Sequence, residues 1–137
     1  MADIVVRHEG GDRFRVTVRG HMLLVDQPDG PRGEDLGPTP TELFVASLAS
    51  CVGFYAERYL VRHDLPLDGL EVHCRYEMSE QRPARVDSID IEVALPMELS
   101  ASRREALQRV VEHCTVHNSL RMPPEVVTSI TSRVRAA

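Results

Sequence analysis

Three cysteines, Cys51, Cys74 and Cys114, carry the most reactive side chains of the sequence, and each stands in a different setting. The thiolate form of cysteine attacks peroxides and disulfides and also binds metals. A thiol redox reaction needs two cysteines, distant in the sequence, that meet in space beside a cation. Cys51 and Cys114 are the candidates for such a pair. An odd number of cysteines argues against a disulfide scaffold and for thiol or metal chemistry.

Cys74 has the setting of a packing residue. It shares the apolar face of a predicted strand with four neighbours: Leu70, Val72, Tyr76 and Met78. Apolar surroundings raise the pKa of a thiol and make it less reactive. We therefore interpret Cys74 as structural.

Cys114 stands where one predicted helix ends and a further helical turn begins. The backbone N–H groups at a helix N-terminus lower the pKa of a thiol there, which favours a reactive cysteine. A small C-cap residue that ends the preceding helix explains the position equally well. A third interpretation uses Cys114 with His117, three residues further on, and His113 as metal ligands. This set lacks the paired spacing of structural zinc sites.

The element that must position Cys51 is a helix within residues 37–60. Thr39 is a suitable N-cap, Pro40 fits the first helical position, and Glu42 completes a capping box. Residues 43–56 are almost wholly apolar or small, which predicts a helix buried on every side. This run is shorter than the ~20 residues that cross a bilayer. Cys51 lies in its middle.

Hydrophobic alternation and turn residues predict the remaining elements. Ser102 and Glu105 have the spacing of a second capping box, which would open a helix ending near Cys114. The fold class is α+β, a single domain over residues 1–137 with antiparallel sheets packed around a buried central helix. We expect strands at 2–8, 13–19, 21–26, 70–78, 88–95 and 126–134, and shorter helices at 102–113 and up to residue 120.

Composition narrows the possible partners. The formal net charge is −5 and basic residues are scattered, which argues against a nucleic-acid partner. No signal peptide or long apolar run is visible, so we expect a cytoplasmic protein without a membrane partner. All 16 basic residues are arginine, so Schiff-base and P-loop chemistry are excluded and arginine is the only strong cation for a thiolate. One chain of 137 residues covers a fully buried helix poorly, which suggests a homodimer sharing its core.

Residues 37–51 and 114–120 resemble the OsmC/Ohr family of bacterial thiol-dependent peroxidases, and the chain looks closest to its OsmC-like branch. The resemblance covers nearly the whole chain. It implies an intertwined homodimer with two active sites at the subunit interface. Cys51 would be the peroxidatic thiolate, and Cys114 would resolve its sulfenic acid to a disulfide. An external dithiol or lipoyl-type reductant would then reset the pair, without a cofactor or metal.

The resemblance also implies an arginine that holds the thiolate charge and donates to the peroxide oxygens. Arg32 is the closest match for it, and Arg19 is the runner-up. Well-studied members have a carboxylate directly after the helix-start proline. Here that position is Thr41, and the acid follows at Glu42. Glu42 is therefore a candidate both for orienting the arginine and for capping the helix.

Four residues near Cys51 are candidates for an apolar mouth that would favour organic hydroperoxides over hydrogen peroxide: Phe44, Leu48, Phe54 and Tyr55. Ordinary core packing is the alternative for each of them. The competing function is a dimeric binding protein of the same fold, which would hold an apolar ligand or a metal and use its cysteines only structurally.

Overall fold

The computed structural model describes residues 3–133 and has an α+β architecture. An antiparallel sheet of order β1-β2-β3 comes first, and an antiparallel hairpin of β4 and β5 follows the long helix α1. Two shorter helices complete the fold. The strands are β1 (Ile4–Gly10), β2 (Arg13–Val18), β3 (His21–Val25), β4 (Glu71–Met78) and β5 (Val86–Ala94), and the helices are α1 (Pro40–Arg62), α2 (Ala101–Val111) and α3 (Thr115–Arg121).

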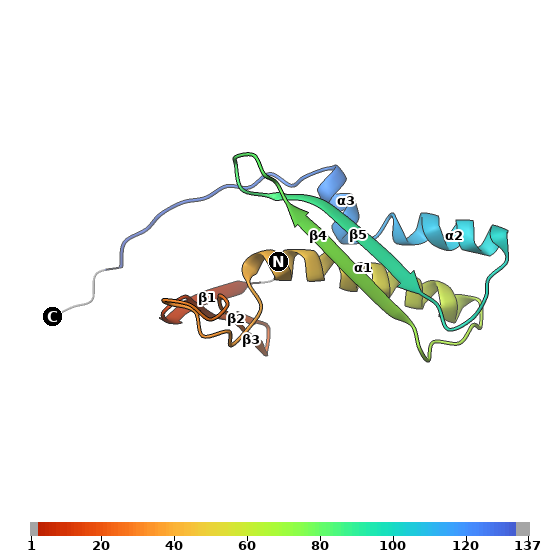
Figure 1. The fold of residues 1–137 in the computed structure, drawn as a ribbon, viewed down its shortest axis with the longest axis horizontal. Helices are drawn as coiled ribbons and strands as arrows, with labels where there is room; N and C mark the ends of the chain where they lie inside the picture. Colours follow the sequence, from red (N-terminus) through yellow and green to blue (C-terminus); the bar gives the residue numbers. More distant parts are fainter. Residues whose placement is uncertain (1–2, 134–137) are drawn as a thin grey trace.

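Helix α1 is the element against which the second half of the chain packs (Figure 1). The β4–β5 hairpin lies across it, and α2 and α3 contact it as well. The three-stranded sheet lies near the N-terminal end of α1 (Figure 1). This arrangement confirms the predicted class of antiparallel sheets combined with helices.

The N-terminus of α1 forms as the sequence predicts. The Thr39 hydroxyl accepts a hydrogen bond from the Glu42 N–H at 3.1 Å, and the Glu42 carboxylate accepts one from the Thr39 N–H at 2.8 Å. These two bonds satisfy donors that a helix N-terminus leaves free. The helix then runs for 23 residues to Arg62, well beyond the apolar run.

Burial of α1 is one-sided within a single chain. Its buried residues recur three or four positions apart, which is the spacing of one helical face: Val45, Leu48, Val52, Ala56, Tyr59 and Leu60. Phe44 and Phe54 lie on the remaining surface, about half exposed. A single hairpin and two short helices cover only one face of α1, as expected of one chain of this length, so enclosure of the helix on every side would need a second copy and stays a prediction.

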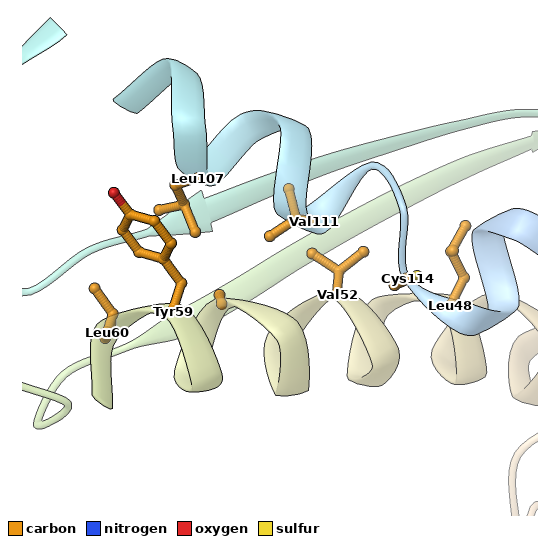
Figure 2. Close-up of a cluster of buried hydrophobic side chains, with 8 residues drawn as sticks. Leu48, Val52, Tyr59, Leu60, Leu107, Val111 and Cys114 are labelled. Carbon is orange, nitrogen blue, oxygen red and sulfur yellow. The ribbon is translucent and has the colours of Figure 1, made fainter. Parts of the chain in front are cut away.

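The hydrophobic core lies between this face of α1, the β4–β5 hairpin and α2 (Figure 2). Tyr59 and Leu60 extend it toward the C-terminal end of α1, where Leu107 of α2 meets them. Cys114 is part of the same cluster and is fully buried. Within residues 3–133, no helix combines the length and the apolar character needed to cross a membrane.

Helix α2 begins earlier than predicted. Its N-cap is Ser100, whose hydroxyl accepts from the Arg103 N–H at 3.3 Å, so the predicted capping box at Ser102 does not form. Both serines have suitable side chains, and the earlier one takes the cap because its backbone is extended, as a cap requires.

The C-terminal segment contains no strand over residues 126–133, where the sequence predicts one; Val134 lies outside the described residues. The segment instead runs as an extended chain away from the body (Figure 1). Its apolar side chains are exposed, Val126 at 80%, Val127 at 83% and Ile130 at 95%. A strand needs a partner for its backbone hydrogen bonds, and this segment has none within the described part of the chain.

Candidate functional site

Two of the three cysteines meet at the centre of α1. Cys51 projects from the helix at the edge of its buried face and packs against the core cluster that contains Cys114. Cys114 reaches the same place from the connection between α2 and α3 (Figure 2). The two thiols are neighbours, close enough for Cys51 to influence the pKa of Cys114, and both are free. The structure therefore brings together the pair that a dithiol–disulfide reaction requires.

The environment of Cys114 keeps its thiol neutral. Burial raises the pKa of Cys114, and the adjacent Cys51 raises it further. Cys114 is also the N-cap of α3, and its sulfur accepts a hydrogen bond from the His117 N–H at 3.4 Å, which acts in the opposite direction. The net pKa is raised, so loss of water outweighs the helix terminus. The sequence alone left a reactive thiol and a helix C-cap open; the structure makes Cys114 the N-cap of α3, whereas the C-cap of α2 is Glu112, and burial raises the pKa of the Cys114 thiol.

Hydrogen bonds from two side chains of α3 stabilise the connection between α2 and α3. The Asn118 amide donates to the His113 carbonyl at 3.1 Å, and Arg121 donates to the Glu112 carbonyl at 2.6 Å. These bonds satisfy carbonyl groups at the end of α2. Cys114 thus lies on a short connection whose flanking turns are fixed to each other.

A further hydrogen bond joins α3 to α1. The hydroxyl groups of Tyr55 and Thr115 lie 3.0 Å apart. Tyr55 follows Cys51 by one helical turn, and Thr115 is the residue directly after Cys114. Sequence reasoning placed Tyr55 only in an apolar wall and did not identify Thr115, because no local pattern indicates a contact between segments so distant in the chain.

The four predicted mouth residues are divided between two cavities. Phe44 and Leu48 line a cavity of about 600 Å³ that α1 forms with β5, α2 and α3. Phe54 and Tyr55 line a smaller one of about 280 Å³ against Val110 of α2. Cys51 lines neither of these cavities, and Leu48 is itself a buried core residue. Within a single chain the four side chains do not form one mouth.

The larger cavity also contains a histidine. His117 lines it together with Leu120, and its pKa is lowered by burial and by the charge of Arg121. The imidazole is therefore neutral at neutral pH. His113 does not line this cavity, and its Nδ1 donates a hydrogen bond to the Arg109 carbonyl at 2.7 Å. Over residues 3–133, no three His, Cys, Asp or Glu side chains gather in a way that would hold a metal.

Arg32 lies in the loop after β3, and its side chain reaches the turn between β1 and β2. Its guanidinium donates to the Gly11 carbonyl at 3.0 Å and lies 3.4 Å from the Asp12 carboxylate. Gly11 has a φ of +52°, and a Cβ there would lie 2.3 Å from the Arg32 carbonyl oxygen, so a side chain at this turn would displace the loop. Arg19, the runner-up, occupies the β2–β3 turn with a φ of 54°.

The loop that carries Arg32 is organised by a buried carboxylate. Asp26 is only 1% exposed and accepts hydrogen bonds from the N–H groups of Gln27, Glu34 and Leu36 at 2.8, 3.2 and 3.2 Å. Burial alone would raise the pKa of Asp26, but these donors lower it below its usual value. Sequence reasoning missed Asp26. The available signal was an aspartate between an apolar strand and a Gly- and Pro-rich loop, where Asp side chains bind backbone N–H groups.

Two candidates have clear structural surroundings. The Glu42 carboxylate is bound to the N-cap of α1, which is the capping role considered from the sequence. Cys74 is half-buried on β4 opposite Ile91 of β5. Burial raises the pKa of Cys74, and the Asp90 carboxylate raises it further. The raised pKa makes the Cys74 thiol less reactive, as its strand position predicts.

A family comparison decides how this arrangement is classified. The sequence profile of the OsmC-like proteins matches residues 33–129, which run from Gly33 into the extended tail and include both central cysteines. The chain belongs to the OsmC-like family. No match was found among curated protein sequences.

Solved structures of OsmC-like proteins share this fold at low sequence identity. A Psychrobacter arcticus protein, for which a role in osmotic stress and detoxification is proposed, superposes with a TM-score of 0.79 at 21% identity, covering 87% of this chain and 88% of its own. An OsmC-like protein of Mycoplasma pneumoniae gives 0.71 at 16%, covering 88% and 87%. The organic hydroperoxide resistance protein OhrB of Bacillus subtilis gives 0.64 at 16%, covering 90% and 92%.

Proposed function

We propose that this OsmC-like protein is a thiol-dependent peroxidase that reduces organic hydroperoxides. The observation that carries the proposal is the contact between Cys51 and Cys114, two free thiols brought together from separate elements. Membership in the OsmC-like family and the shared fold with a hydroperoxide resistance protein support a stress-related redox role.

In the first step, the Cys51 thiolate attacks the outer oxygen of the hydroperoxide. The O–O bond breaks, the sulfur is oxidised to a sulfenic acid, and the alkoxide leaves and takes a proton to become the alcohol. The charge on the sulfur and on the departing oxygen calls for a guanidinium, for which Arg32 is our first candidate and Arg19 our second.

In the second step, the Cys114 sulfur attacks the Cys51 sulfenic acid. An S–S bond forms, the S–O bond breaks, and the hydroxyl leaves as water with the Cys114 proton. The raised pKa of Cys114 keeps this thiol protonated while Cys51 reacts with the peroxide, and the proton passes to the leaving hydroxyl as the Cys114 sulfur attacks as a thiolate. An external dithiol, such as a lipoyl-type reductant, then returns both cysteines to thiols and becomes a disulfide itself.

The test is a peroxide assay on single-cysteine variants. With cumene hydroperoxide and a dithiol, wild type should consume peroxide, and Cys51→Ser should not exceed the uncatalysed rate. Without the dithiol, Cys114→Ser should still consume one equivalent of peroxide and then stop. Cys74→Ser is the matched control and should behave as wild type. A Cys51→Ser variant as active as wild type would reject the proposal.

The principal competing function is a binding protein for an apolar ligand. The cavity of about 600 Å³ favours it, since its volume suits a small ligand and its walls include Leu48 and Leu107. Counting free thiols after one equivalent of peroxide separates the two functions. The peroxidase loses two thiols per chain and keeps Cys74, whereas a binding protein with structural cysteines keeps all three.

We also propose that the working unit is an intertwined homodimer. The exposed face of α1 and the apolar tail are the surfaces that a second copy would cover. Sedimentation should give a dimer for wild type. Ile130→Asp should weaken it, while Thr131→Asp, an exposed neighbour without an apolar side chain, should not. A monomeric wild type at micromolar concentration would contradict this assembly.

A further inference from the structure

The connection that carries Cys114 lies between α2 and α3, and the position of α3 relative to both α2 and α1 determines where Cys114 lies. Asn118 and Arg121 attach α3 to the end of α2, as described above. Neither bond reaches α1, on which Cys51 lies. A helix of seven residues is not stable by itself, so its position depends on such contacts. Whatever holds α3 against α1 therefore sets the distance between the two sulfur atoms.

The Tyr55–Thr115 hydrogen bond holds α3 against α1 close to the two sulfur atoms. Residues four positions apart on a helix share a face, so Tyr55 is on the Cys51 side of α1. Thr115 is covalently adjacent to Cys114. Over residues 3–133 it is the only hydrogen bond between a side chain of α1 and a side chain of α3. The aromatic body of Tyr55 packs against the hydrophobic core cluster and borders the smaller cavity, which Val110 also lines.

We infer that Tyr55 and Thr115 are positioning residues for the resolving cysteine. Their hydrogen bond keeps Cys114 beside Cys51 and so raises the probability that the Cys51–Cys114 disulfide forms. This role deepens the proposed peroxidase function and rests on it for the peroxide step. The bond acts on the second step, in which Cys114 attacks, and leaves the attack of Cys51 on peroxide unchanged.

Nearby Tyr59 provides an internal control. Its hydroxyl donates to the Arg103 carbonyl of α2 at 3.3 Å, so it joins the same helix α1 to a different element. Removing that hydroxyl deletes a comparable hydrogen bond without touching the segment that carries Cys114. Any effect specific to Tyr55 is then an effect on the sulfur pair and not a general loosening of α1.

The first experiment uses a glutathione redox buffer and no peroxide. In this exchange, two protein thiols are oxidised to the disulfide while one glutathione disulfide is reduced to two glutathione thiols. Tyr55→Phe and Thr115→Val should each lower the equilibrium constant about 2- to 10-fold, the range for one hydrogen bond. Thr115→Ser keeps the hydroxyl and should stay near wild type, as should Tyr59→Phe. The double variant should lose no more than either single variant.

The second experiment follows one turnover with cumene hydroperoxide. A probe that traps sulfenic acids measures the first step. The disappearance of the free Cys114 thiol measures the second step. Thr115→Val should form the sulfenic acid at the wild-type rate and convert it to the disulfide about 2- to 10-fold more slowly.

The outcomes separate the two proposals. A wild type that does not react with peroxide overturns the peroxidase, and the glutathione measurement still tests the positioning role. Equal glutathione equilibria for wild type and Tyr55→Phe, or an equal loss in Tyr59→Phe, overturn the positioning role. The free energy of unfolding of each variant is measured alongside, and a loss of disulfide stability that only follows global stability also overturns it.

Discussion

The thiol of Cys114 is completely buried and lies beside Cys51, which approaches it from the middle of a different element. This contact joins the long helix to the α2–α3 connection at one point. The chemistry of the pair depends on which sulfur gives up its proton, and the surroundings of Cys114 favour the neutral form there.

The titration of Cys114 is the first prediction. In a Cys51→Ser/Cys74→Ser variant, where Cys114 is the only thiol, thiolate absorbance should rise with a midpoint above the ~8.5 of free cysteine, because burial remains. The same group links pH to stability. Because the pKa of Cys114 is raised in the folded state, the contribution of this thiol to the free energy of unfolding is fully present below its unfolded pKa. The contribution is lost as the pH rises through the folded-state pKa. A midpoint below that of the urea-unfolded variant would contradict this.

A second prediction concerns the arginine that we propose as support for the Cys51 thiolate. Arg32→Ala should lower the rate of the first peroxide step on the order of 10²-fold, as for loss of one donor to a developing negative charge. Arg32→Lys should recover part of the rate, and Arg19→Ala is the comparison variant. The rate is measured by trapping the sulfenic acid in single turnover. A large loss in Arg19→Ala with none in Arg32→Ala would assign the role to the runner-up.

A third prediction separates the two roles considered for Glu42. Glu42→Gln keeps an oxygen that accepts from the Thr39 N–H, so the free energy of unfolding should change by less than about 0.5 kcal/mol and peroxide turnover should be retained. Thr39→Ala removes the other half of the capping box and should cost ~1 kcal/mol in urea unfolding. If Glu42→Gln is fully stable but inactive, the carboxylate takes part in the reaction.

A fourth prediction follows from the buried carboxylate of Asp26. Its lowered pKa means that its contribution to stability is present above the unfolded pKa of about 4 and is lost as pH falls through the folded value. Asp26→Asn should therefore be less stable than wild type at neutral pH, and the difference should shrink in acid. Urea midpoints over a pH series measure it. Asp29→Asn, an exposed aspartate of the same loop, should show no such trend.

The parts of the fold that depend on local sequence were predictable. The capping box at Thr39 and Glu42 forms as expected, and the strand alternation around Cys74 gives the observed β4–β5 hairpin. These features are decided within a few residues of one another, so periodicity and cap chemistry are sufficient.

The parts that failed depend on backbone conformation or on distant segments. The choice of Ser100 over Ser102 as N-cap rests on backbone conformation, which the sequence does not display. The Tyr55–Thr115 bond joins residues 60 positions apart, and no pattern of residue types predicts it. Of the candidate site, the sequence supplied the two cysteines, and only the structure shows that they meet.

The extended C-terminal segment has a consequence for the lifetime of an unassembled copy. Residues 126–133 are exposed along their length and form no regular structure, which is the kind of chain that a protease can bind. Newly made subunits should therefore be cleaved there until a second copy covers the segment, and limited proteolysis should become slower as protein concentration rises. Pairing would then decide how much protein survives as well as whether it is active.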